Sequence, residues 1–150
     1  MLQQGLRLLY IGSMRRFSFV SLLAMCLGCG ALAAAQQPAT PARKGGSPDA
    51  AKLVNPVASS PESVAAGRRA YNQFCGNCHG ATGRGDGSGA AAGTPPADLT
   101  DAVWDYGSTD GEIFTVIRDG TGNEMGGYAE RLKDADIWNI VNHVRTLAKK

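Results

Sequence analysis

The stretch Cys75-Gly76-Asn77-Cys78-His79 decides how the rest of this 150-residue chain is interpreted. Its two thiols lie about one helical turn apart, and an imidazole directly follows the second thiol. The spacing Cys-x-x-Cys-His is typical of covalent c-type haem attachment. In that chemistry the thiols add across the two vinyl groups of one porphyrin edge, and the imidazole becomes an axial ligand of the iron. The pattern therefore predicts one haem joined through Cys75 and Cys78, with His79 bound to its iron.

The same residues also fit three other chemistries, each of which needs parts that this sequence supplies poorly. A structural zinc ion takes four ligands, and beyond the first 35 residues the only Cys and His are Cys75, Cys78, His79 and His143. A thioredoxin-like pair normally lies in a βαβ pattern, and the sequence shows no convincing strand. A disulfide between Cys75 and Cys78 closes so small a loop that it adds little constraint. Haem attachment is the interpretation that the surrounding sequence favours.

Helical signals surround this stretch. Ser60-Pro61-Glu62 supplies a capping hydroxyl and a proline at the first helical position, and it predicts a helix that ends at Cys75. Thr109-Asp110-Gly111-Glu112 is a capping box that predicts a second helix ending before Gly120. The apolar spacing of a last amphipathic helix is shown by Ile137, Ile140, Val141, Val144 and Leu147. We therefore expect an all-α fold of three to five helices.

The folded part, residues 61–150, offers a thin supply of core. Residues 80–96 contain six glycines and two prolines, and they show no apolar alternation that would make a strand. A small domain buries only about 60% of the surface that its unfolded chain exposes. We therefore expect these residues to form a loop that wraps around a haem, which fills the centre of the domain.

The charge of the chain is distributed unevenly. The whole chain has a formal net charge of +2, but residues 61–150 hold 9 Lys and Arg against 12 Asp and Glu, a net −3. The basic excess therefore lies near the N-terminus, and no nucleic-acid partner is predicted. An acidic domain instead predicts a protein partner with a basic surface and encounter rates that fall as salt rises.

The N-terminal residues have the features of a secretory signal peptide. Arg15 and Arg16 precede an apolar run that closes on three alanines, which predicts a leader over residues 1–35 with Met14 as an alternative start. The expected location is the periplasm, where idle dithiols are oxidised. A retained leader, or a lipid on Cys26 or Cys29, would instead attach the chain to a membrane.

Residues 36–60 are rich in proline, alanine, glycine and serine, and they contain few large apolar side chains. Such a stretch buries too little surface to offset the entropy of ordering it. It is predicted to be a linker, which serves as a tether or as an arm lying on the domain surface.

A sixth ligand for the iron is expected at Met125. It is the only methionine beyond the leader, and it lies in the glycine-rich turn of residues 122–127. Met/His ligation raises the reduction potential of a haem. Two alternatives remain, since methionine often fills cores and His143 is a rival ligand. His143 lies on the packing face of the last helix, where a helix–helix contact is expected.

Taken together, residues 61–150 resemble a bacterial single-haem class I c-type cytochrome. Besides the Cys75–His79 motif, the matching features are Gly67, Tyr71, His79-Gly80-Ala81-Thr82-Gly83, Gly85-Asp86-Gly87, Pro95-Pro96-Ala97-Asp98-Leu99-Thr100, the Met125 loop ending in Tyr128, and Asp136-Ile137-Trp138. The resemblance implies a small cytochrome c fold in which the first and last helices cross, with Gly67 permitting their close approach.

The resemblance also implies a set of residues around the haem. The carbonyl of Pro95 or Pro96 is expected to accept a hydrogen bond from the His79 ring and so fix its orientation. Leu99 and Tyr128 are the further expected contacts of the haem. The chain departs from the family pattern at His143, where an aromatic residue is usual, and at Lys133, where a capping Ser or Thr is usual and Asp134 is the expected substitute.

The function that the resemblance implies is one-electron transfer outside the cytoplasm, without catalysis. The expected partners are a donor dehydrogenase or respiratory complex and an acceptor such as an oxidase, and the free protein is expected to be a monomer. Two alternatives stay open. One is a haem enzyme or ligand sensor in which the Met125 ligand is labile, and the other is a haem subunit of a larger membrane respiratory or dehydrogenase complex.

Overall fold

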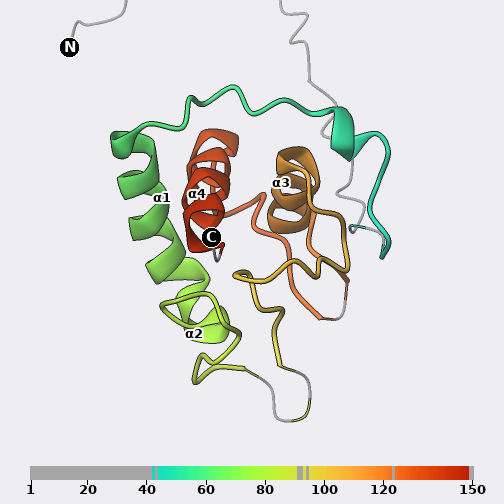
Figure 1. Cartoon of the computed structure of the whole chain (residues 1–150), viewed down its shortest axis with the longest axis vertical. Coiled ribbons are helices and arrows are strands. Elements are labelled where there is room, and N and C mark those ends of the chain that lie inside the picture. Colours follow the sequence, from blue (N-terminus) through green and yellow to red (C-terminus); the bar gives the residue numbers. More distant parts are fainter. Residues whose placement is uncertain (1–41, 43, 91–92, 94, 123, 149–150) are drawn as a thin grey trace, which may run out of the picture. The chain divides into compact units, whose positions relative to one another are not determined.

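The computed structural model describes residues 42, 44–90, 93, 95–122 and 124–148. The elements, which Figure 1 shows in order along the chain, are η1 (Ala50–Lys52), α1 (Pro61–Phe74), α2 (Gly76–His79), α3 (Asp110–Asp119) and α4 (Asp134–Leu147). Among the described residues the only β-type pairing is an isolated antiparallel bridge between Gly120 and Gly126. The all-α prediction is therefore confirmed.

The predicted leader, residues 1–35, lies outside the described residues, and so do Met14, Cys26 and Cys29. Within the described part, none of the helices combines the length and apolar character needed to cross a bilayer.

The pairing of α1 with α4 forms the centre of the fold. Tyr71 of α1 and Ile137, Ile140 and Val141 of α4 are the large side chains that are fully buried. Gly67 lies at the closest approach, where an added Cβ would meet the backbone oxygen of Asn139 and lie 3.0 Å from the Cβ of His143. Only glycine leaves the backbone of α4 this room, so the predicted crossing of the first and last helices rests on Gly67.

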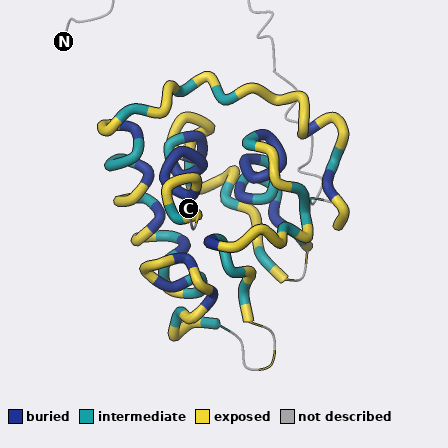
Figure 2. The backbone as a smooth tube through the Cα atoms, viewed as in Figure 1, coloured by how far each residue is buried: buried dark blue, intermediate teal, exposed yellow. Residues whose placement is uncertain are grey.

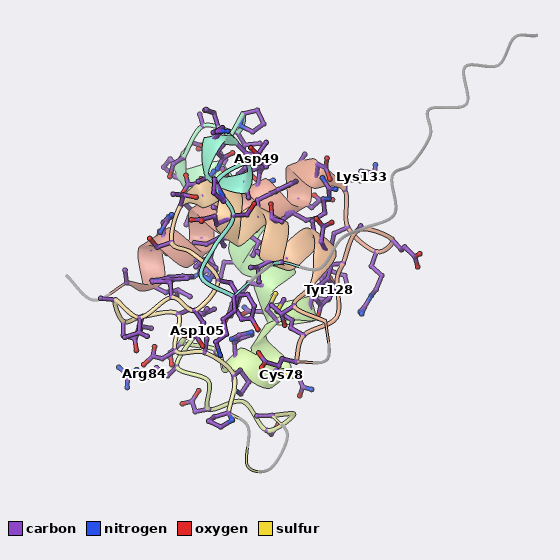
Figure 3. The ribbon with its side chains drawn as sticks, turned by 90° about the vertical axis from the view of Figure 1, so that its right-hand side faces the viewer. Asp49, Cys78, Arg84, Asp105, Tyr128 and Lys133 are labelled. Atoms are coloured by element: carbon purple, nitrogen blue, oxygen red, sulfur yellow. The ribbon has the colours of Figure 1, made fainter. Side chains whose placement is uncertain are left out.

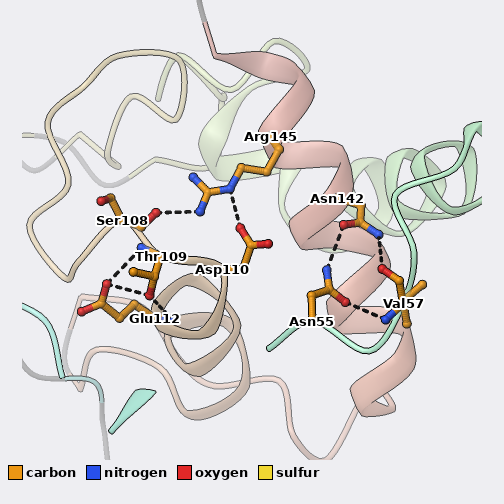
Figure 4. Close-up of polar contacts among 8 residues, drawn as sticks. All are labelled: Asn55, Val57, Ser108, Thr109, Asp110, Glu112, Asn142 and Arg145. Atoms are coloured by element: carbon orange, nitrogen blue, oxygen red, sulfur yellow. Dashed lines mark hydrogen bonds and ion pairs between the residues drawn. The ribbon is translucent and has the colours of Figure 1, made fainter. Parts of the chain in front are cut away.

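The third helix packs against α4 from the other side. Phe114 of α3 stacks on Trp138 of α4 with ring centroids 4.1 Å apart and an interplanar angle of 11°. Near the end of α4, the Arg145 guanidinium donates to the Asp110 carboxylate and to the Ser108 carbonyl, both at 2.6 Å (Figure 4). Figure 2 shows that the buried residues gather on α3 and α4.

Of the three helices predicted from the sequence, two begin at the expected capping residue. The Ser60 side chain accepts a hydrogen bond from the Ser63 amide at the start of α1, and Thr109 and Glu112 cap each other reciprocally at the start of α3. At α4 the expectation for Asp134 was wrong: Lys133 is the N-cap without a side-chain bond, and Asp134 is the first helical residue. There its carboxylate still favours the positive end of the helix dipole.

The segment 44–60, predicted as part of a linker, lies along the domain as a surface arm. Hydrogen bonds join the start of this arm to the rest of the domain. They run from the Ala42 amide, just before the arm, to the Gly120 carbonyl at 2.7 Å, from the Gly45 amide to the Asp105 carbonyl at 2.7 Å, and from the Ser47 amide to Glu112 Oε1 at 3.1 Å. Farther along, the Asn55 amide donates to Asn142 Oδ1 of α4 at 2.9 Å (Figure 4). Of the two alternatives predicted for this segment, a tether or a surface arm, the structure shows the arm, with Ala50 buried and Val57 packed against the core.

Candidate functional site

The short helix α2 carries the two thiols and the imidazole of the central motif. Cys75 is its N-cap, and the amides of Cys78 and His79 donate to the Cys75 carbonyl at 3.1 and 2.9 Å. Both cysteines are free, and Cys75 is only 8% exposed. Burial, and then the nearby Cys78, raises the pKa of the Cys75 thiol to about 12. One turn of helix therefore presents two unpaired thiols beside a histidine.

The His79 ring is oriented by a backbone carbonyl. Its Nδ1 lies 3.2 Å from the Ala97 oxygen, and burial lowers the pKa of the ring while this bond partly opposes the shift. Because a neutral imidazole that donates from Nδ1 keeps its lone pair on Nε2, the nitrogen turned away from Ala97 is the one suited to a metal.

The acceptor differs from the expected proline carbonyls. The Pro96 oxygen faces the backbone of Gly85, where an added Cβ would collide with it, and Pro95 is exposed. The carbonyl that reaches His79 therefore belongs to the residue after the two prolines. The sequence indicated the right segment but not the direction of its individual carbonyls.

A glycine-rich loop closes over α2. The amides of Gly85, Gly87 and Gly89 donate to the carbonyls of His79, Cys78 and Asn77 at 2.9, 3.0 and 2.8 Å. At Gly87 an added Cβ would meet the backbone of Cys78, so only glycine lets the loop come this close. The loop thus satisfies the last carbonyls of α2, which no helical partner reaches.

The same loop is anchored at both ends to the helical core. The buried Tyr71 hydroxyl donates to the Gly80 carbonyl at 2.9 Å, and the Leu99 amide donates to the Gly83 carbonyl at 2.6 Å. The Leu99 side chain is half-buried and packs against the core. Leu99 therefore fixes the return of the loop from the glycine-rich stretch to the helices.

Met125 lies half-buried in a second loop, residues 120–128, that follows α3. The Tyr128 amide donates to the carbonyls of Ile117 and Arg118 at the end of α3, both at 3.0 Å. The Tyr128 hydroxyl donates to the Phe74 carbonyl at 2.9 Å. Because Phe74 immediately precedes Cys75, Tyr128 brings the end of the Met125 loop next to the motif, and Figure 3 shows Tyr128 near Cys78.

Three contacts of the site were missed by the sequence analysis. One is the Ala97 carbonyl. Another is Arg131, whose guanidinium lies 5.3 Å from the Phe74 ring centroid and 5.0 Å from that of Tyr128. The third is Thr121, whose hydroxyl accepts from the Met125 amide. None of these contacts leaves a periodic pattern, and only the four-residue spacing from Thr121 to Met125 hinted at a closed turn.

His143, the rival ligand, lies between α1 and α4. It is 5% exposed, and its ring meets that of Tyr71 edge to face with centroids 5.2 Å apart. Within the described part of the chain, neither of its buried ring nitrogens has a hydrogen-bond partner. Burial, and then the charge of Arg68, lowers its pKa. The ring thus forms the helix–helix contact that its position predicts.

The residues fit a covalently bound haem. Two free thiols one turn apart are available for thioether bonds, and the imidazole beside them contacts a carbonyl through Nδ1, which keeps the lone pair of Nε2 for a metal. The described residues contain no group of three or more His, Cys, Asp or Glu side chains placed to hold a metal ion among themselves.

Known proteins share this fold and this motif region. Residues 62–144 match the family described as cytochrome c oxidase, cbb3-type, subunit III. The cbb3-type cytochrome c oxidase subunit CcoP of Azospirillum sp. (strain B510) is 29% identical over 94 residues, which are 63% of this chain and 32% of that protein. The chain thus spans about a third of the length of this curated relative.

Solved structures agree with this relationship. A chain of the reducing HAO-like protein complex of Kuenenia stuttgartiensis is 28% identical with a TM-score of 0.58, over 66% of this chain and 49% of that one. Cytochrome cL of Methylophaga aminisulfidivorans is 24% identical with a TM-score of 0.51, over 64% of this chain and 58% of that one, and it supports the fold alone.

Proposed function

The chain belongs to the family of the cbb3-type cytochrome c oxidase subunit III, and from this premise we propose that residues 61–150 carry single electrons between redox proteins. The c-type cytochrome domain of this family holds haem c covalently. When bound, the haem supplies an iron that takes up and gives off one electron.

The attachment is assigned to α2. Cys75 and Cys78 would form the two thioether bonds, and His79 would be one axial ligand through Nε2. The observation that carries this assignment is the His79 Nδ1 contact with the Ala97 carbonyl at 3.2 Å, beside two free thiols. A carbonyl on Nδ1 fixes the tautomer and the ring orientation that an iron ligand needs. The glycine-rich loop fixes α2 itself.

Met125 is assigned as the second axial ligand. Its loop is pinned at Tyr128 to the residue before Cys75, which brings that loop to the motif. If His79 and Met125 both bound the iron, no position would be left open for oxygen or peroxide, which favours electron transfer over catalysis. Leu99 and Tyr128 would then pack around the haem from the two loops.

The proposed setting is the periplasm, with a dehydrogenase or respiratory complex as donor and an oxidase or similar protein as acceptor. The partner would approach over the small residues of the loops around 83–93 and 126–128. The net charge of −3 on residues 61–150 favours a basic partner surface. We expect the rate with the donor to fall as salt rises, and a rate independent of salt would contradict this electrostatic part.

A second candidate is a subunit of a larger complex, in which the haem relays electrons internally. It is favoured by the relatives, since one is named as an oxidase subunit and another lies in a protein complex. Gel filtration of the native protein separates the two, because a free carrier elutes as a small monomer and a subunit elutes with its complex.

The ligand assignment is tested with the variants Met125→Ala and His143→Phe of the haem-loaded protein. Met125→Ala is expected to lower the reduction potential and to let carbon monoxide bind the reduced iron rapidly. His143→Phe, which removes the rival ligand, is the matched control and should keep the wild-type spectrum. Rapid carbon monoxide binding by the wild type would instead favour the haem enzyme or sensor, and a spectral change in His143→Phe would overturn the Met125 assignment.

A further inference from the structure

We propose that Thr121 is the positioning residue of the Met125 ligand. The inference rests on the proposed function, in which Met125 binds the iron, and it concerns how the chain holds that side chain in place.

Thr121 holds Met125 through both of its backbone polar groups. The Met125 amide donates to Thr121 Oγ1 at 3.0 Å, and the Thr121 amide donates to the Met125 carbonyl at 2.8 Å. The Met125 side chain leaves from the Cα between these two groups. Fixing both groups with one residue therefore fixes the direction of the Met125 Cα–Cβ bond, from which the thioether extends.

Thr121 is itself attached to the helical scaffold. It follows Gly120, whose amide donates to the Val116 carbonyl at the end of α3 and whose carbonyl accepts from the Ala42 amide of the N-terminal arm. The bridge between Gly120 and Gly126 closes the base of the loop. Thr121 therefore transmits the position of α3 to Met125.

A second hydroxyl supports the same arrangement. The Tyr106 hydroxyl donates to Glu124 Oε2 at 2.7 Å, and Glu124 immediately precedes Met125. Tyr106 thus braces the Met125 loop from the segment that precedes α3.

The consequence appears in competition for the iron. An external ligand binds only the fraction of molecules in which the methionine has left, so its apparent affinity rises as the loop loosens. Losing one hydrogen bond of this kind corresponds to a change of about two- to tenfold in such an equilibrium.

The experiment compares Thr121→Val with Thr121→Ser in the haem-loaded protein. Valine keeps the shape of threonine but removes the hydroxyl, whereas serine keeps the hydroxyl. Thr121→Val is expected to bind imidazole about fivefold more tightly in the oxidised state, to weaken the red absorption band that marks sulfur–iron bonding, and to lower the reduction potential. Thr121→Ser should restore all three readouts to near wild type.

Two further variants separate positioning from general stability. Thr115→Val removes the bond from the Thr115 hydroxyl to the Gly111 carbonyl at 2.9 Å within α3, and it should leave imidazole affinity unchanged. Tyr106→Phe should shift imidazole affinity in the same direction as Thr121→Val, by about twofold. If Thr121→Val fails to fold, Tyr106→Phe and Thr121→Ser still decide the question.

Wild-type imidazole affinity and an intact red band in Thr121→Val would overturn the inference while leaving Met125 as the ligand. The same is true if Thr115→Val changes both readouts as strongly as Thr121→Val. Absence of the red band from the wild-type protein would instead overturn the ligand assignment, and the inference with it.

Discussion

The α1–α4 pair and the two loops around α2 are ordered by different means. The helix pair buries Tyr71, Ile137, Ile140 and Val141 completely. Among their described residues, the loops of residues 80–99 and 120–128 contribute half-buried apolar side chains such as Leu99 and Tyr128, and they are held by backbone hydrogen bonds. Full burial of one such aliphatic side chain contributes about 1.5–3 kcal/mol, whereas a hydrogen bond contributes a net of about 0.5–1.5 kcal/mol.

This difference indicates a division of roles. The helices supply an apolar frame that is too small to fold well alone, and the loops carry the groups proposed to contact the haem. Loops with so little apolar surface of their own need something to wrap around. The haem is therefore expected to stabilise the loops more than it stabilises the helix pair.

The largest effect is expected for the double variant Cys75→Ala/Cys78→Ala, which removes both thiols proposed to hold the haem. Without the thiols the exported chain should lose its haem on acid denaturation, and the haem-free chain should be poorly folded, with a weak far-UV circular dichroism signal and no sharp unfolding transition. Gln73→Ala, at an exposed position of α1, is the control and should retain colour and fold. A compact, cooperatively unfolding double variant would show that the haem is not needed as core.

The close packing of α1 against α4 is tested separately at Gly67. Gly67→Ala places a Cβ against the Asn139 carbonyl, and we expect a loss of about 2–3 kcal/mol in the free energy of unfolding. Gly126→Ala makes the same substitution in the Met125 loop, where an added Cβ meets nothing within 4 Å, and should change stability little. Urea unfolding measures both, and equal losses would contradict the close crossing at Gly67.

The pH dependence of stability tests the packing of His143 between α1 and α4. Burial holds the pKa of the folded ring below its ordinary 6.5. Below pH 6.5 the unfolded chain therefore binds a proton that the folded chain lacks, and stability falls until the folded pKa is reached. Between pH 8 and pH 5 the wild type should lose more stability in urea than His143→Phe. An identical loss in both proteins would assign the acid sensitivity to other groups.

The smallest expected effect concerns the N-terminal arm. Gly45 and Gly46 share φ values of +87° and +85°, but only Gly46 has a neighbour that a Cβ would strike, namely the Glu112 carboxylate. Gly46→Ala should therefore cost about 1 kcal/mol more than Gly45→Ala in thermal or urea unfolding. Equal costs would mean that the arm contributes nothing to stability at this contact.

The helices α1, α3 and α4 were largely predictable from the sequence. Ser60 and the Thr109–Glu112 box marked the starts of α1 and α3, and the apolar repeat marked α4, because caps and periodicity are local properties of the chain. The Cys75–His79 spacing predicted two thiols one turn apart beside an imidazole, and the short helix α2, which was not predicted, holds them so.

The remainder depends on where backbone groups point after the chain has folded. Ala97 was missed as the His79 acceptor because the turn at Gly85 directs the Pro96 carbonyl elsewhere. The composition left open whether residues 44–60 form a tether or a surface arm, because the bonds of the arm join it to residues distant in sequence. Thr121 left only the weak signal of its four-residue spacing from Met125, because its hydroxyl and amide bonds lie within one loop.

The most direct test of the central claim is the mass of the exported protein under denaturing conditions, read together with its pyridine haemochrome spectrum. The expected mass is that of the chain without residues 1–35 plus one haem, with the spectrum of a haem bound through two thioethers. A colourless polypeptide with no added mass, which still unfolds cooperatively, would contradict the proposal that a covalent haem completes the domain and carries its electron.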